Sequence, residues 1–80
     1  MLHPDPKIQA ALVDNDLKQG KIYAEKKFCA LLGCERTWPI DHRKSGLLKM
    51  GEHYIMLGGK IRYTGLQIAT ILAHGITLPK

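Results

Sequence analysis

The sequence predicts one small α+β domain, in which several short helices accompany a single β-hairpin. Apolar residues recur at spacings of three and four in several segments, which is the spacing of one helix face. The period changes near residues 54–63, where two β-compatible runs flank a pair of glycines. Eighty residues are enough for one domain with a modest core. This length favours a scaffold that presents a surface over one that encloses a deep catalytic cleft.

The first predicted helix covers residues 5–19. Asp5 is a good N-cap, Pro6 suits the first helical position and Gly20 stops the segment. Poor helix formers at residues 14–16 also allow the helix to end or fray earlier. Its apolar stripe is wide enough to pack on another element and consists of Ile8, Ala11, Leu12, Val13 and Leu17.

A short strand and a second helix are predicted next. Residues 21–24 are β-compatible, and the pattern becomes helical from residue 24 or 25 to Leu32. Gly33 can adopt the left-handed conformation that ends a helix. This helix is therefore expected to end in a tight turn.

A further short helix is expected between Arg36 and Gly46. Thr37 is expected to cap it, and Pro39 falls in the first turn, where its missing N–H costs little. Trp38 is expected to pack in the core rather than to stack on a base. Two helices joined by a Gly-containing turn of about four residues form a helix-turn-helix.

A β-hairpin and a last helix complete the chain. Residues 54–57 and 60–63 flank Gly58-Gly59, a two-residue signal for a hairpin with a primed turn. Thr64 is expected to cap the last helix, which Gly75 ends. The apolar stripe of this helix consists of Leu66, Ala69, Leu72 and Ala73, with Ile68 and Ile71 beside it.

This order of helix, turn, helix, hairpin and helix is that of a winged helix-turn-helix with a two-stranded wing. The domain is expected over residues 21–75, with an extra, accessory N-terminal helix in residues 1–20 and a tail at residues 76–80.

Three stretches carry a family resemblance. They read IYAEKKFCALLG at residues 22–33, RTWPIDHRKSG at residues 36–46 and LGGKIRY at residues 57–63. Together they resemble the small phage excisionases and the related prophage regulators, and more distantly the MerR-type DNA-binding domains. The resemblance spans residues 22–72, and its glycine-tipped stretch is the most specific part. Arg43 departs from it, because the family carries an apolar residue there.

The resemblance implies a winged helix-turn-helix that binds duplex DNA and serves a mobile element. The implied role is excision directionality, as a recombination accessory factor, or transcription regulation. Cooperative self-association on repeated DNA sites, or a recombinase partner, is implied as well.

The charge distribution also points to nucleic acid. The net charge of +5 is concentrated in residues 21–62, which carry nine Lys or Arg against four Asp or Glu. A basic surface favours a polyanion, with DNA or RNA ahead of a membrane because no strongly amphipathic basic helix accompanies it. A wing suits duplex DNA better than RNA.

The second helix of the motif and the wing supply the candidate DNA-binding residues. Near the N-terminal end of a helix in the major groove, Arg36 can form two hydrogen bonds with a guanine, while Lys44 and Ser45 suit phosphate groups. Glycines at the wing tip let the backbone approach the sugar-phosphate or the minor groove. The full candidate set is Arg36, Thr37, His42, Arg43, Lys44, Ser45, Gly58, Gly59, Lys60 and Arg62.

Neither enzyme chemistry nor a cofactor is predicted. A cysteine nucleophile would have no visible orienting group, and paired carboxylates for acid–base work are absent. The cysteines are expected to be thiols. The residues that would form a zinc site lack the usual ligand spacing, and they are Cys29, Cys34, His42 and His53.

The chain carries no signal for export or for a membrane. Its N-terminus lacks the pattern of a signal peptide, and no apolar run reaches the length of a membrane span. A cytoplasmic protein is therefore expected.

A protein-interaction module is the alternative that stays open, since the first helix offers a spare apolar face. Convergence of the basic residues of the motif and the wing on one face would favour DNA. An exposed patch of Ile8, Leu12 and Leu17 would favour a protein partner.

Overall fold

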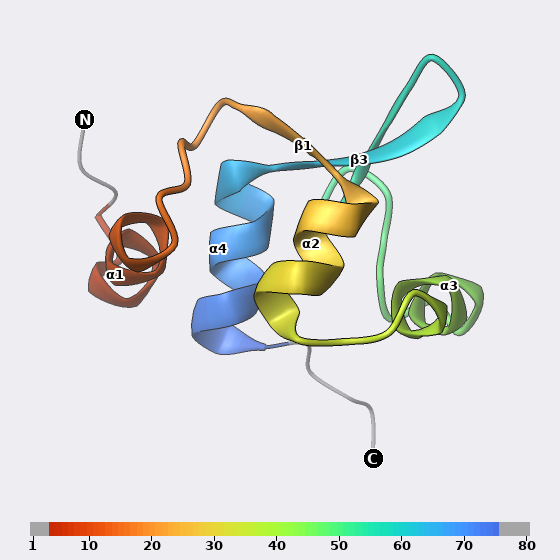
Figure 1. The fold of residues 1–80 in the computed structure, drawn as a ribbon, viewed down its shortest axis with the longest axis horizontal. Coiled ribbons are helices and arrows are strands. Elements are labelled where there is room, and N and C mark those ends of the chain that lie inside the picture. Colours follow the sequence, from red (N-terminus) through yellow and green to blue (C-terminus); the bar gives the residue numbers. More distant parts are fainter. Residues whose placement is uncertain (1–3, 76–80) are drawn as a thin grey trace.

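A computed structural model describes residues 4–75 of the chain. Within this range the chain forms four helices and a three-stranded antiparallel sheet, which confirms the predicted α+β class (Figure 1). The tail predicted at residues 76–80 lies outside the described residues. In chain order the elements are α1 (Pro6–Asp14), β1 (Ile22–Ala24), α2 (Glu25–Leu32), α3 (Thr37–Lys44), β2 (Ile55–Leu57), β3 (Lys60–Thr64) and α4 (Gly65–His74).

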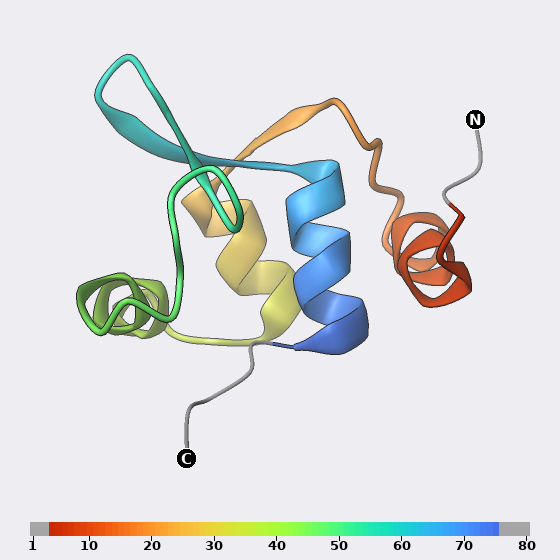
Figure 2. The same ribbon diagram turned by 180° about the vertical axis from the view of Figure 1, so that it is seen from behind.

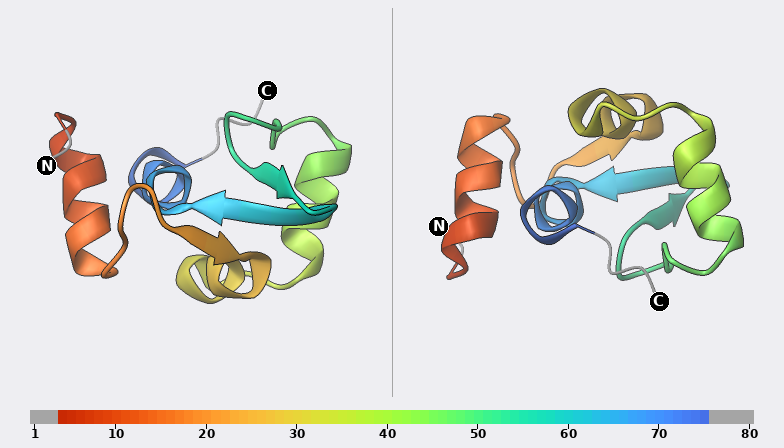
Figure 3. Two further views of the ribbon diagram at one scale, coloured as in Figure 1. Left: turned by 90° about the horizontal axis from the view of Figure 1, so that it is seen from above. Right: turned by 90° about the horizontal axis from the view of Figure 1, so that it is seen from below.

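The sheet has the order β1-β3-β2, so β3 lies between two antiparallel partners. Tyr63 of β3 pairs with Tyr23 of β1, and Ile61 pairs with Met56 of β2. The helices lie on one side of the sheet, and its other face is left uncovered by residues 4–75 (Figures 1 and 3). The sheet therefore has one face that packs on the core and one open face.

The β2–β3 hairpin turns at Gly58 and Gly59, as the sequence predicts. Their φ angles are 57° and 77°, and a type I′ turn needs a positive φ at both central residues. Glycine reaches this region without the steric cost of a Cβ. The two-residue turn sets the register in which Leu57 pairs with Lys60.

The predicted caps of the first and last helices are confirmed. The Asp5 side chain accepts hydrogen bonds from two backbone amides in the first turn of α1. Thr64 and Gln67 form a reciprocal capping box at the start of α4. Both helix starts therefore follow from residues close in sequence.

The first helix ends at Asp14, earlier than the predicted end at Gly20. Residues 14–16 are poor helix formers, and Asp16 takes a left-handed φ of 52°. The Leu17 amide then donates to the carbonyl oxygen of Leu12 (2.8 Å). This early turn lets Leu17 join the core.

The third helix begins without the predicted cap. Arg36 precedes it with helical φ and ψ angles of −62° and −26°, and no side chain caps its first turn. The prediction of Thr37 as N-cap is therefore wrong, and Thr37 is the first helical residue. The reason is that the chain already turns at Glu35, whose carbonyl oxygen accepts from the Trp38 amide (3.1 Å).

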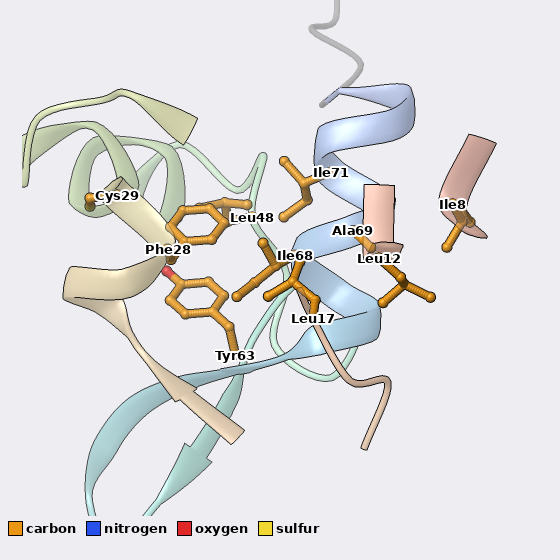
Figure 4. Close-up of a cluster of buried hydrophobic side chains, with 10 residues drawn as sticks. All are labelled: Ile8, Leu12, Leu17, Phe28, Cys29, Leu48, Tyr63, Ile68, Ala69 and Ile71. Carbon is orange, nitrogen blue, oxygen red and sulfur yellow. The ribbon is translucent and has the colours of Figure 1, made fainter. Parts of the chain in front are cut away.

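The core is built around a stacked aromatic pair. The rings of Phe28 on α2 and Tyr63 on β3 are nearly parallel, with centroids 4.0 Å apart. Figure 4 shows this pair facing the apolar side chains of α4. The buried hydrophobic residues are Ile8, Leu12, Leu17, Phe28, Cys29, Leu48, Tyr63, Ile68, Ala69 and Ile71.

The apolar face of α1 packs against α4. Ile8, Leu12 and Leu17 are only 7%, 4% and 6% exposed, and Figure 4 shows Leu12 and Leu17 beside α4. Most of the predicted apolar stripe of the first helix therefore belongs to the core of the domain, while Val13 is 66% exposed.

The segment before β1 crosses the start of α4 at close range. The amide of Gly65 donates to the Lys21 carbonyl oxygen (3.0 Å), and the amide of Leu66 donates to the Gln19 carbonyl oxygen (3.2 Å). A Cβ on Gly65 would lie 1.9 Å from the Lys18 carbonyl oxygen. Position 65 therefore requires glycine because no side chain fits there.

The substitution Gly65→Ala is expected to destabilise the fold. Residues 18–21 would have to move away from α4, and overpacking of this kind costs about 1–3 kcal/mol. Urea unfolding followed by circular dichroism measures the loss. Gly20→Ala is the matched control, because a Cβ at Gly20 meets no atom within 4 Å. Equal unfolding midpoints for the two variants would contradict the close approach.

A side-chain hydrogen bond joins the two ends of the described chain. His74 Nε2 at the end of α4 lies 2.8 Å from Asp5 Oδ2 at the start of α1. The hydrogen bond with His74 lowers the pKa of the Asp5 carboxyl, and the two amide donors of α1 lower it further. The pair therefore stabilises the contact of α1 with α4 while Asp5 is ionised.

This contact predicts a titration effect. A lowered carboxyl pKa stabilises the fold above the ordinary value of 3.8, and the stabilisation is lost as the pH falls through the lowered pKa. His74→Ala is expected to raise the pKa of Asp5 towards the ordinary value in an NMR titration. His53→Ala serves as the control, since His53 contacts the Lys49 amide instead. An unchanged Asp5 pKa in His74→Ala would rule out the contact.

Candidate nucleic-acid interface

The third helix and the β2–β3 hairpin lie on the same side of the molecule, and α1 lies on the opposite side (Figures 1 and 2). In Figure 1 the hairpin extends beyond the core towards the side on which α3 is seen end-on. The two elements that the sequence singled out for DNA contact therefore lie on one side of the molecule.

The outward face of α3 carries a mixed set of polar side chains. Exposed positions recur at spacings of three and four, which defines one side of a helix. Ile40 is 39% exposed on this side, and Asp41 adds an acid among the cations. The exposed residues of α3 and its two ends are Arg36, Thr37, Ile40, Asp41, Lys44 and Ser45.

The inward face of α3 holds two aromatic rings. Trp38 lies 6.2 Å from Phe28, centroid to centroid, and it is half-buried against the core. The His42 ring stacks on Trp38 at 3.9 Å, and its Nδ1 lies 2.7 Å from the Trp38 carbonyl oxygen. His42 is thus engaged within α3, although the sequence singled it out as a DNA contact.

Arg43 is held inside the domain by a polar cluster that we call the Glu25–Arg43–Tyr63 cluster. Glu25 Oε1 accepts hydrogen bonds from Arg43 Nη1 and from the Tyr63 hydroxyl, the latter at 3.1 Å. Arg43 Nη1 also donates to the Tyr63 hydroxyl (3.2 Å). Its guanidinium lies 5.8 Å from the Tyr54 ring centroid. Arg43 therefore serves the fold, although the sequence singled it out as a DNA contact.

Arg43 and Tyr63 keep their protonation states at physiological pH. Burial raises the pKa of the Tyr63 hydroxyl, and the nearby Glu25 raises it further. Burial alone would lower the pKa of Arg43, but the hydrogen bond with Glu25 and its charge outweigh burial and raise it. Tyr63 stays a neutral donor and Arg43 stays a cation.

The basic residues of the wing lie on the open face of the sheet. Side chains alternate between the two faces of a strand, and Tyr63 points into the core, so Lys60 and Arg62 point the other way. Lys60 is exposed next to the turn. Arg62 is half-buried and donates to the Ile61 carbonyl oxygen (2.9 Å). The turn and Lys60 are therefore the fully exposed parts of the wing, while Arg62 is only partly accessible.

A shallow pocket lies where α2 begins and the chain enters α3. It has a volume of about 280 Å³ and is lined by Glu25, Lys26, Cys29 and Arg36. Lys26 is not among the DNA-binding residues predicted from the sequence. The only feature that marks it there is the pair of adjacent lysines, Lys26-Lys27, in a predicted helix. Its position beside Arg36 depends on the angle between α2 and α3.

The two cysteines are free thiols at the end of α2. Cys29 is buried, Cys34 is half-buried, and the Cys34 amide donates to the Cys29 carbonyl oxygen (3.1 Å). Burial raises the pKa of the Cys34 thiol to about 11, and a hydrogen bond with Cys29 adds to the shift. Cys34 is therefore a protonated thiol at neutral pH.

Among residues 4–75, no three His, Cys, Asp or Glu side chains gather closely enough to hold a metal ion. Over the same range, no helix combines the length and the apolar character needed to cross a membrane.

The chain matches no protein-family model, and no curated protein or solved structure is significantly similar to it. What it binds therefore has to be inferred from its own residues and their geometry.

Removing the acid of the Glu25–Arg43–Tyr63 cluster is expected to destabilise the fold. Glu25→Gln leaves the Arg43 guanidinium, only 18% exposed, without its carboxylate, and losses of this kind cost roughly 1–3 kcal/mol. Chemical denaturation gives the difference in unfolding free energy. Glu35→Gln is the matched control because Glu35 is exposed and has no ion pair among the described residues. If Glu25→Gln were no less stable than this control, the cluster would not hold α3.

Proposed function

We propose that this chain is a winged helix-turn-helix protein that binds duplex DNA, with α2 and α3 as the helix-turn-helix and the β2–β3 hairpin as the wing. The observation that carries the proposal is that α3 and the hairpin lie on the same side of the molecule. Both elements are joined to α2 through the Glu25–Arg43–Tyr63 cluster. The sheet order supports it as well, since β3 of the wing pairs with β1, which runs directly into α2.

The exposed face of α3 is suited to a major groove, which is about 12 Å wide in B-form DNA. Thr37 offers a hydroxyl to base edges, and Asp41 can accept a hydrogen bond from the amino group of a cytosine. Lys44 at the end of the helix suits a phosphate, which orients the protein without reading sequence. The mixture of donor, acceptor and cation favours a duplex with a preferred sequence.

The wing supplies contacts with the DNA backbone. Gly58 and Gly59 carry no side chains, so their backbone can approach a sugar-phosphate chain closely. Lys60 adds a cation next to this turn, while Arg62 is half-buried on the open face of the sheet. We therefore assign the wing contact to the turn and Lys60 ahead of Arg62.

A role with a mobile element rests on the resemblance of residues 22–72 to phage excisionases and prophage regulators. The proposed role is excision directionality or transcriptional control. Self-association on repeated sites, or a recombinase partner, belongs to the same proposal.

The alternative of a protein-interaction module depended on a free apolar face of α1. Ile8 and Leu12 on that face are buried where α1 packs on α4, and Leu17 after the helix is buried as well. We therefore propose no function for α1 beyond its part in the core.

Fluorescence anisotropy with a labelled mixed-sequence duplex tests DNA binding directly. The chain is expected to bind at about 50 mM salt and to lose affinity by orders of magnitude at about 200 mM, because contacts with phosphates release counterions. Absence of binding at the lowest salt concentration would contradict the proposal.

Variants identify the surface that binds. Lys44→Ala and Lys60→Ala are each expected to weaken binding to all duplexes by a similar factor, with a salt slope that is shallower by about 1. Lys7→Ala is the matched control, because Lys7 is an exposed lysine on α1, on the opposite side of the molecule. An equal loss in Lys7→Ala would place the DNA elsewhere.

A further inference from the structure

The pocket between α2 and α3 brings together two cations from different elements. Lys26 is the second residue of α2, and Arg36 immediately precedes α3. Both side chains are exposed, and both line the pocket. Neither forms an ion pair among the described residues. Two cations at the rim of one pocket favour an anion.

The acid in the pocket does not cancel these charges. Glu25 also lines the pocket, but its Oε1 already accepts hydrogen bonds from Arg43 and Tyr63. The charge of Arg43 compensates that of Glu25. The remaining wall is Cys29, a small and weakly polar side chain. The charge that faces a ligand is therefore that of Lys26 and Arg36.

The size of the pocket favours a small anion. Its volume of about 280 Å³ lies below the range of roughly 300–1,000 Å³ typical of pockets that bury drug-sized ligands. A single phosphate group needs much less space. Arg binds phosphate through its planar fork, and Lys binds it as a point charge.

We infer that Lys26 and Arg36 together bind one phosphate group of the DNA backbone. This inference rests on the proposed function, in which the first helix of the motif crosses the DNA backbone. It gives Arg36 a different role from the base contact expected from the sequence. Arg36 positions the duplex with Lys26, and the reading of bases is left to the exposed face of α3.

The test compares Lys26→Ala, Arg36→Ala and the double variant on several duplexes of different sequence over a range of salt. Each single variant is expected to weaken binding to every duplex by a similar factor, and its salt slope is expected to change by less than 1 because the other cation still contacts the phosphate. The double variant is expected to lose about 1 in slope and not 2, because both side chains bind one phosphate. Far-UV circular dichroism verifies that each variant is folded.

Lys27→Ala is the matched control. Lys27 is an exposed neighbour of Lys26 on α2 but does not line the pocket. The inference is wrong if Lys26→Ala and Lys27→Ala have the same affinity and salt slope. It is also wrong if Arg36→Ala changes the order of preference among the duplexes. In either case, DNA binding by the chain would still hold.

A second arm uses inorganic phosphate on the ¹⁵N-labelled chain. Phosphate is expected to shift the amide signals of Lys26 and Arg36, and these shifts are expected to disappear in Arg36→Ala. If phosphate binds there but no duplex binds at low salt, the ligand is a free anion, and both the backbone contact and the proposed function fail. If duplexes bind but phosphate shifts neither amide, the pocket is not an anion site and only the inference fails.

Discussion

The position of α3 depends on a polar cluster as well as on apolar burial. Pro39 is its one buried residue, and Trp38 packs half-buried beside Phe28. Arg43 reaches from α3 to Glu25 on α2 and to Tyr63 on β3, and Tyr63 is in turn stacked on Phe28. A half-buried guanidinium that loses its carboxylate destabilises the fold. The cluster therefore favours the arrangement in which α2, α3 and the hairpin are in contact.

The same cluster decides which side chains are left for a partner. With Arg43 directed inward and His42 stacked on Trp38, the outward face of α3 consists of Thr37, Ile40, Asp41 and Lys44. Under the proposed function, this face is built before DNA binds, which reduces the entropy lost on binding. The cations that we propose to contact DNA come from three elements, α2, α3 and the hairpin.

Local features of the fold could be predicted from the sequence because they depend on neighbouring residues. The turn at Gly58-Gly59 and the cap at Thr64 are of this kind, since each is decided within a few residues. Long-range features could not be predicted. The inward direction of Arg43 requires Glu25 on another helix, and the pairing of Lys26 with Arg36 requires the angle between α2 and α3. The one local hint was that Arg43 stands where the family that the sequence resembles carries an apolar residue.

We propose that α3 and the hairpin form one DNA-binding surface on the side opposite α1. A titration of the ¹⁵N-labelled chain with a short duplex at low salt, followed by amide chemical shifts, tests this proposal most directly. We expect shifts in residues 36–45 and 58–60, while the signals of α1 stay unchanged. Shifts concentrated in α1, or shifts in α3 with none in the hairpin, would contradict it.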